Sequence, residues 1–147
     1  MDINSSSYEH YRKSALVTIN TVEQTVSDIG PVLLDLGNVC YRSGLSISTD
    51  SSHHYIHRKG LYRVDAALTF VPLKDGILTV YLTVDGQKLS ASVRTQTVHI
   101  GDTYTINVAV PAFNADQALV GDAAVEMYCK GATGEITCVM VGTVKLA

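Results

Sequence analysis

The chain has 147 residues, of which 46% are hydrophobic and only 17% charged, and its formal net charge is −3. A chain of this length buries enough surface to fold without a metal or disulfide, and its low charge content suits a protein that covers part of its surface with other chains. Lys and Arg do not cluster, which excludes sequence-independent binding of nucleic acid. The chain shows neither a secretory leader nor an apolar run of about 20 residues, so we expect synthesis in a host cytoplasm and no membrane insertion.

The first 14 residues differ from the rest of the chain. They hold a serine run followed by Tyr8 and Tyr11, with no strand pattern. Two interpretations stay open: an arm that docks on a neighbouring protein through Tyr8 and Tyr11, or an end that is poorly ordered on its own. We expect an arm over 1–14 and one domain over 15–147.

Strands are expected along the whole domain. In 61–70, 77–84 and 103–110, apolar and polar side chains alternate strictly, which is typical of strands with one face on a core. Shorter β-rich runs predict further strands at 15–22, 32–34, 39–47 and 88–96. No window of ten or more residues there has a helical stripe, so we predict an all-β fold.

Turn sequences separate these runs. Asp85-Gly86 lies between two alternating segments and is a strong hairpin signature. Glycine-containing turns also occur at 74–76, 101–102 and 131–134. Eight to ten short strands at this spacing are typical of a β-sandwich or jelly roll.

The last predicted strand, 136–146, is apolar on both faces. Strict alternation from Ile136 places Val139 and Val141 on the outer face, where Tyr81 and Tyr128 are also expected. A strand that is apolar on both sides is usually covered on both sides. We therefore expect a subunit interface at these four residues; scattered apolar surface is the alternative.

A histidine-rich segment, Ser51 to His57, is the densest candidate for chemistry. If it is extended, His53, Tyr55 and His57 share one face and His54 lies opposite. His53 and His57 are weak candidates for metal ligands, because no second ligand cluster occurs at suitable spacing. A polar loop leading into the strand at Leu61 is the favoured interpretation, and we expect no metal or other cofactor.

No catalytic motif occurs in the chain, so we expect no enzymatic activity and assign no catalytic residue. Asp35, Asp65 and Glu126 lie on or near predicted strands, and the sequence leaves a carboxylate pair among them open. Cys129 and Cys138 flank a short turn and are expected nearly opposite each other across a hairpin. Free thiols are favoured over a disulfide because synthesis is expected in a reducing compartment.

Two stretches carry a resemblance to a known family. Gly60 to Phe70 (GLYRVDAALTF) and Gly76 to Gln87 (GILTVYLTVDGQ) resemble consecutive strands of the tumour necrosis factor-like and complement globular-head-like jelly rolls, and 134–146 resembles the closing strand of that family. The resemblance covers roughly Val22 to Ala147 and is strongest toward the bacteriophage branch. It implies a homotrimeric, TNF-like jelly roll of a virion: a head-decoration or head-fibre protein.

The expected partners follow from the same resemblance. They are two further copies of the chain and a capsid or other virion protein bound through the N-terminal arm. The alternative function is a receptor-binding, glycan-binding tip of a tail fibre or baseplate. For that function the loops 48–57 and 112–122 supply Tyr55, Phe113 and Asn114 as candidate contacts.

Overall fold

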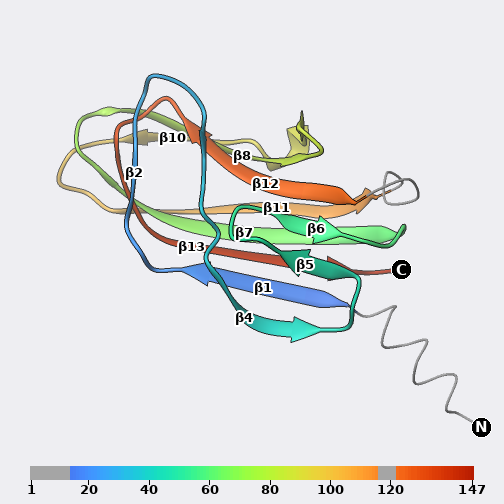
Figure 1. Ribbon diagram of the computed structural model, residues 1–147. Helices are drawn as coiled ribbons and strands as arrows, with labels where there is room; N and C mark the ends of the chain where they lie inside the picture. The colour runs from blue at the N-terminus through green and yellow to red at the C-terminus, as the bar shows by residue number, and fades with distance from the viewer. Residues whose placement is uncertain (1–13, 116–121) are drawn as a thin grey trace, which may run out of the picture.

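The computed structural model describes residues 14–115 and 122–147, which form two antiparallel sheets lying face to face (Figure 1). Sheet A has the spatial order β11-β7-β13-β1-β4, with β2 paired to β13. Its strands are β1 (Ala15–Asn20), β2 (Gln24–Val26), β4 (Asn38–Ser43), β7 (Leu61–Pro72), β11 (Tyr104–Asn114) and β13 (Gly134–Lys145).

Sheet B has the order β10-β8-β12-β6-β5, with β3 paired to β12 and β9 paired to β8. Its strands are β3 (Val32–Leu33), β5 (Ile47–Thr49), β6 (His54–Ile56), β8 (Gly76–Val84), β9 (Gln87–Lys88), β10 (Arg94–Val98) and β12 (Ala123–Lys130). A single 3-10 turn, η1 (Ser90–Ser92), is the only helical segment in the described residues, and none there is long enough to cross a membrane. The predicted all-β jelly roll is confirmed.

Alternating side chains build the core between the sheets. On β7, every second residue from Tyr62 to Phe70 is buried, and the same pattern recurs on β11 and β12. The largest enclosed side chains include Tyr62 and Phe70 from sheet A and Leu78, Leu82 and Met127 from sheet B. Each fully buried side chain of this size stabilises the fold by roughly 1.5–3 kcal/mol.

Most predicted turns carry the chain from one sheet to the other. β7 lies in sheet A and β8 in sheet B, so the turn at 74–76 joins different sheets, and the turn at 131–133 does the same between β12 and β13. Cys129 and Cys138 therefore lie in different sheets, and the expectation that they face each other across a hairpin is wrong. Both thiols are free.

The Asp85-Gly86 turn does close a hairpin, between β8 and β9. Its two residues have φ of 51° and 80°. Positive φ at both central residues is typical of the type I′ turn, whose twist matches that of paired strands.

Three other predicted segments differ from the structure. The expected strand at 88–96 is divided into the end of β9, the turn η1 and the start of β10. The expected strand at 39–47 is divided at Gly44 (φ 75°) into β4 in sheet A and β5 in sheet B. The histidine-rich segment, expected as a polar loop, contains strand β6, and His54 is fully buried between the sheets. His54 lies opposite His53 and Tyr55, as expected for an extended segment.

A β-bulge in β13 reverses the expected faces of its C-terminal half. Ile136 pairs with Phe70 and Cys138 with Thr69, so Thr137 is an extra residue in the ladder. An inserted residue changes which side chains point inward. As a result both Ile136 and Val139 face the core.

Candidate functional site

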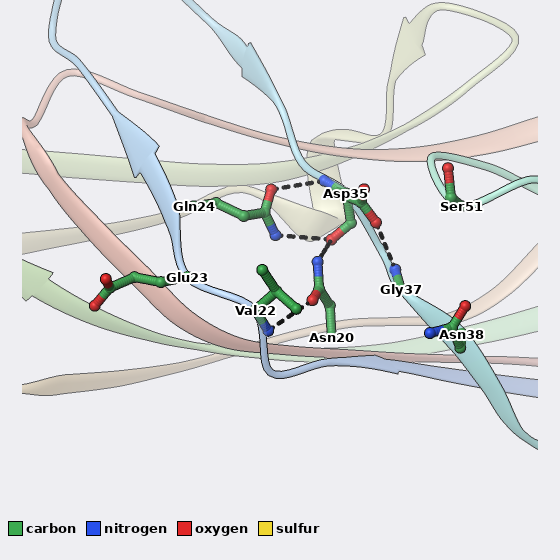
Figure 2. A pocket seen from close by; sticks show the side chains of 8 residues that line it. All are labelled: Asn20, Val22, Glu23, Gln24, Asp35, Gly37, Asn38 and Ser51. Atoms are coloured by element: carbon green, nitrogen blue, oxygen red, sulfur yellow. Dashed lines mark hydrogen bonds between the residues drawn. The ribbon is translucent and has the colours of Figure 1, made fainter.

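A polar hollow lies at the end of the sandwich where β1 turns into β2 and where the chain enters β4 (Figure 2). Its volume is about 380 Å³. It is lined by Asn20, Val22, Glu23, Gln24, Asp35, Gly37, Asn38 and Ser51. We call it the polar hollow below.

Side-chain amides hold the walls of the polar hollow together. The Gln24 amide nitrogen donates to the Asp35 carbonyl (2.8 Å), and the Asp35 backbone N–H donates to the Gln24 side-chain oxygen (2.8 Å). Asn20 adds a bond from Nδ2 to the same carbonyl (3.1 Å), and its oxygen accepts from the Val22 N–H (2.8 Å). These bonds, drawn in Figure 2, fix the β1–β2 turn to the segment before β4.

Gly37 and Ser51 form the opposite wall. Gly37 has φ +81°, and a Cβ there would lie 2.1 Å from the Ile19 carbonyl oxygen, so only glycine fits. Its N–H donates to Asp35 Oδ1 (2.8 Å). Ser51 also has positive φ, 82°, and its carbonyl accepts from the Leu36 N–H.

Several polar groups of the polar hollow remain available. No described residue forms a hydrogen bond with the side chain of Asn38 or Ser51, and only Oδ1 of Asp35 is engaged. The interaction of the Glu135 carboxyl with that of Glu23 raises the pKa of Glu135. The polar hollow therefore offers carboxylate, amide and hydroxyl groups, and no basic side chain lines it.

The outward surface of sheet A is the second candidate site. Register places residues from five strands on it: Val17, Ile19, Tyr41, Ala67, Ala109, Met140 and Val144. We call this surface the apolar face. Met140 is 44% exposed and Tyr41 is 57% exposed. Two charged residues of β7, Arg63 and Asp65, also lie on the outward side of sheet A, and their side chains pair with each other at 2.8 Å.

Val139 and Val141 do not lie on that surface. Both are fully buried and belong to the core of the single chain. The expectation that they face outward and contact another subunit is wrong, because the bulge at Thr137 shifts the alternation by one residue. The outward positions are occupied by Met140 and Gly142 instead.

Tyr81 and Tyr128 do lie on the outward side of sheet B, but they cover each other. Their rings stack with centroids 5.6 Å apart, and Lys88 Nζ lies 4.4 Å from the Tyr81 centroid. Tyr81 is only 7% exposed as a result. An interface at these residues stays a prediction.

His53 and His57 are both engaged by acidic and hydroxyl partners. His53 Nδ1 lies 2.9 Å from Asp50 and its Nε2 3.0 Å from Glu126. His57 lies 2.8 Å from Asp122 and 2.6 Å from Ser48 Oγ. Within 14–115 and 122–147, no group of three or more His, Cys, Asp or Glu has the arrangement to hold a metal ion.

The three expected ligand-loop residues differ in how far they are engaged by neighbours. The Tyr55 hydroxyl donates to Asp50 (2.6 Å), an interaction that lowers the pKa of that carboxyl to about 2. Phe113 packs beside Tyr62 with ring centroids 6.3 Å apart, and Asn114 is exposed at the end of β11. The rest of that loop, and Tyr8 and Tyr11 of the expected arm, lie outside the described residues.

Sequence analysis missed most of the polar hollow. The sequence singles out Asp35 only as a member of a possible carboxylate pair and Ser51 only as part of the histidine-rich segment and the loop 48–57. It gives no indication of Asn20, Gln24 or Asn38. An available indication was the Asp35-Leu36-Gly37 run, because an Asp two residues before a glycine favours a tight turn.

No family model and no curated protein matches the sequence. Solved structures do match in fold. Murine APRIL has a TM-score of 0.68 and 15% identity, covering 91% of this chain and 99% of that one. The globular domain of zebrafish complement 1qA protein has a TM-score of 0.64 and 8% identity, covering 92% and 98%.

The vertex protein P5 of phage PRD1 is also similar, with a TM-score of 0.61 and 12% identity, covering 91% of this chain and 73% of that one. At such low identities the likeness is one of fold. The chain therefore has the TNF-like jelly roll, in agreement with the resemblance in 60–87 and 134–146.

Proposed function

We propose that this protein is a non-enzymatic structural component of a virion, of the capsid-decoration or head-fibre type, that forms a homotrimer through the apolar face. The observation that carries the proposal is the apolar face itself. It spans five strands, and an exposed apolar surface of this kind marks an interaction site.

The geometry of the apolar face suits close packing against another copy. It contains the small residues Ala67 and Gly142, and a hollow of about 220 Å³ is lined by Met140, Asp65 and Asn107 among others. A neighbouring chain can fill such a hollow with one side chain that contacts Met140 and hydrogen-bonds Asn107. The virion part of the proposal is supported by the resemblance of the sequence to the phage branch and by the likeness to a phage vertex protein.

Light scattering after size-exclusion chromatography tests the trimer. We expect three times the mass of one chain at micromolar concentration, and a monomer for Met140→Asp, because burying an unpaired carboxylate costs several kcal/mol. Thr95→Asp, at an exposed position of β10 in sheet B, is the matched control and should stay trimeric. A monomeric wild-type protein, or a trimer unaffected by Met140→Asp, would overturn the assignment of the interface.

The virion role has a separate test. Particles purified by density gradient from the source that encodes this chain are analysed by quantitative mass spectrometry. We expect the protein in the particles at a fixed ratio to the shell protein, and a version lacking residues 1–13 should be released from them. Its absence from purified particles would contradict the proposal.

A receptor-binding tip is the second candidate function. Among the described residues of the expected contact surface, Tyr55 is engaged by Asp50 and Phe113 packs beside Tyr62, whereas Asn114 is exposed. The observation that favours a binding role is the polar hollow, with its available carboxylate, amide and hydroxyl groups.

A further inference from the structure

We propose that the polar hollow binds a neutral sugar residue of a glycan. This inference rests on the second candidate function. It assigns the binding site to Asp35, Asn38 and Ser51 instead of the loops around Tyr55 and Phe113. Asn38 pairs with Ile19, so the polar hollow borders the apolar face.

The size and rigidity of the polar hollow suit a small polar ligand. Its volume of about 380 Å³ falls within the ~300–1,000 Å³ typical of small-molecule sites. The two-way bonding of Gln24 to the Asp35 backbone and the bond from Asn20 fix one wall. A site whose walls are already held in place loses little conformational entropy on binding.

The available groups match the hydrogen bonding of a sugar. A sugar hydroxyl both donates and accepts, so one hydroxyl can donate to the Asp35 carboxylate while accepting from the Asn38 amide. The Ser51 hydroxyl supplies a third contact of either kind. Two hydroxyls on neighbouring ring carbons can form hydrogen bonds with the donors and the acceptors of the polar hollow together. A ligand that only donates or only accepts would leave some of these groups without a partner.

The charge of the polar hollow selects among sugars. Glu23 and Asp35 are acidic, and Lys, Arg and His are absent from its lining residues. Sialic acids, sulfated sugars and phosphates would meet like charge without a compensating cation. The expected ligand is therefore a neutral hexose or N-acetylhexosamine.

Val22 gives the polar hollow one apolar side. Its side chain is 74% exposed and lies beside Asn20 and Gln24 in Figure 2. A pyranose ring has one face made largely of C–H groups, which can cover Val22 while the hydroxyls reach the polar wall. This contact accounts for an exposed valine among polar residues.

The position of the polar hollow agrees with a binding role. The polar hollow lies at the C-terminal end of β1, whereas Ser14 precedes its N-terminal end (Figure 1). The six extended residues of β1 separate the two ends by about 20 Å. A domain attached by its N-terminal segment therefore presents the polar hollow on the far side. In the proposed homotrimer three copies would face the same way, and multivalent binding can raise a weak affinity by about 10²-fold or more.

A glycan array carrying neutral, sialylated and sulfated glycans, probed with the fluorescently labelled full chain, is the first test. Titration of ¹⁵N-labelled protein with the methyl glycoside of the best neutral ligand then locates the site. We expect amide shifts at Gly37, Asn38 and Ser51, and at least a tenfold loss of affinity for Asn38→Ala and Ser51→Ala. Asp35→Asn keeps an oxygen acceptor for the Gly37 N–H and should also weaken binding.

Thr95→Ala, at an exposed position far from the polar hollow, is the matched control and should bind as the wild type does. The proposal is overturned if no neutral glycan binds, if charged glycans are preferred, or if the shifts fall at Tyr55 and Phe113. Light scattering on the same samples separates this outcome from a failure of the trimer. Loss of the trimer changes the mass, whereas a failure of glycan binding leaves the mass unchanged.

Discussion

His54 Nδ1 lies 2.8 Å from Thr143 Oγ1 across the interior, and this contact joins strand β6 of sheet B to strand β13 of sheet A. The other ring nitrogen, Nε2, lies 2.8 Å from Thr18 Oγ1 on β1. A neutral imidazole has one donor and one acceptor, so two hydroxyls satisfy it completely. Burial lowers the pKa of His54 to about 4.

Acid should therefore destabilise the fold through His54. The unfolded chain binds a proton near pH 6.5 and the folded chain only near pH 4, so stability falls as the pH drops through this window. The expected loss from this group is about 2 kcal/mol at pH 5 and about 3 kcal/mol at pH 4. Urea denaturation at pH 7, 5 and 4 measures it, and His54→Leu should lack this component. Equal pH dependence in both proteins would contradict the role of His54.

Gly37 and Gly86 form a matched pair for testing how closely the backbone at Gly37 approaches the Ile19 carbonyl in the polar hollow. Both have φ near +80°, but a Cβ at Gly37 would meet the Ile19 carbonyl, whereas a Cβ at Gly86 would meet nothing within 4 Å. Gly86→Ala should cost about 1 kcal/mol for the left-handed backbone alone. Gly37→Ala should cost several times more, because the backbone of β1 must also move. Similar losses in urea denaturation would contradict the expected clash.

Val139→Ala should weaken the fold and leave the oligomer intact. Val139 is fully buried between the sheets, and removing two methyl groups from a core of this density costs about 2 kcal/mol. The expected result is a lower urea midpoint with an unchanged mass by light scattering. A normal midpoint combined with a dissociated protein would place Val139 at an interface after all.

Tyr81→Ala should destabilise the outer surface of sheet B by about 2 kcal/mol, since it removes both a nearly buried ring and its stacking on Tyr128. Tyr81→Phe keeps the stack and should be close to neutral. Urea denaturation separates the two variants. If Tyr81→Ala changed the mass of the assembly without changing stability, the surface would be an interface, as the sequence predicted.

The three thiols should react at very different rates with a maleimide. Cys40 is exposed on β4, whereas Cys129 is enclosed in the core, where burial raises the pKa of its thiol to about 12. Cys138 lies half-buried on the outward side of β13 beside Thr69. Mass spectrometry should show Cys40 labelled first and Cys129 last, and Cys138 labelled faster in Met140→Asp than in the wild type. An unchanged rate at Cys138 would argue against a covered apolar face.

The sandwich could be predicted from the sequence because alternation is a local property. Runs such as 61–70 and 103–110 show their period within a few residues, and the structure confirms them as parts of β7 and β11. The bulge at Thr137 could not be predicted, since nothing in that residue marks it as extra, and it reversed the faces expected for Val139 and Val141.

The candidate site could not be predicted from the sequence, for a different reason. The polar hollow is assembled from Asn20, Asp35 and Ser51, which come together only when β1, β4 and the β5–β6 connection are in place. His54 was hidden in the same way. The local sequence predicts a polar loop there, because the two hydroxyl partners of His54 lie 36 and 89 residues away in the sequence.

The position of β13 has a consequence for how the protein is made. This strand pairs with β1, β2 and β7, so it occupies the middle of sheet A although it follows all three of them in the chain. A nascent chain that has reached residue 130 holds β1 and β7 but lacks the strand that joins them. Sheet A must then wait for residues 134–145 to leave the ribosome, and such long-range pairing is slow, on the order of milliseconds to seconds. Until then the apolar inner surface of sheet A is incomplete, which makes the interval before β13 emerges the period of greatest risk of aggregation.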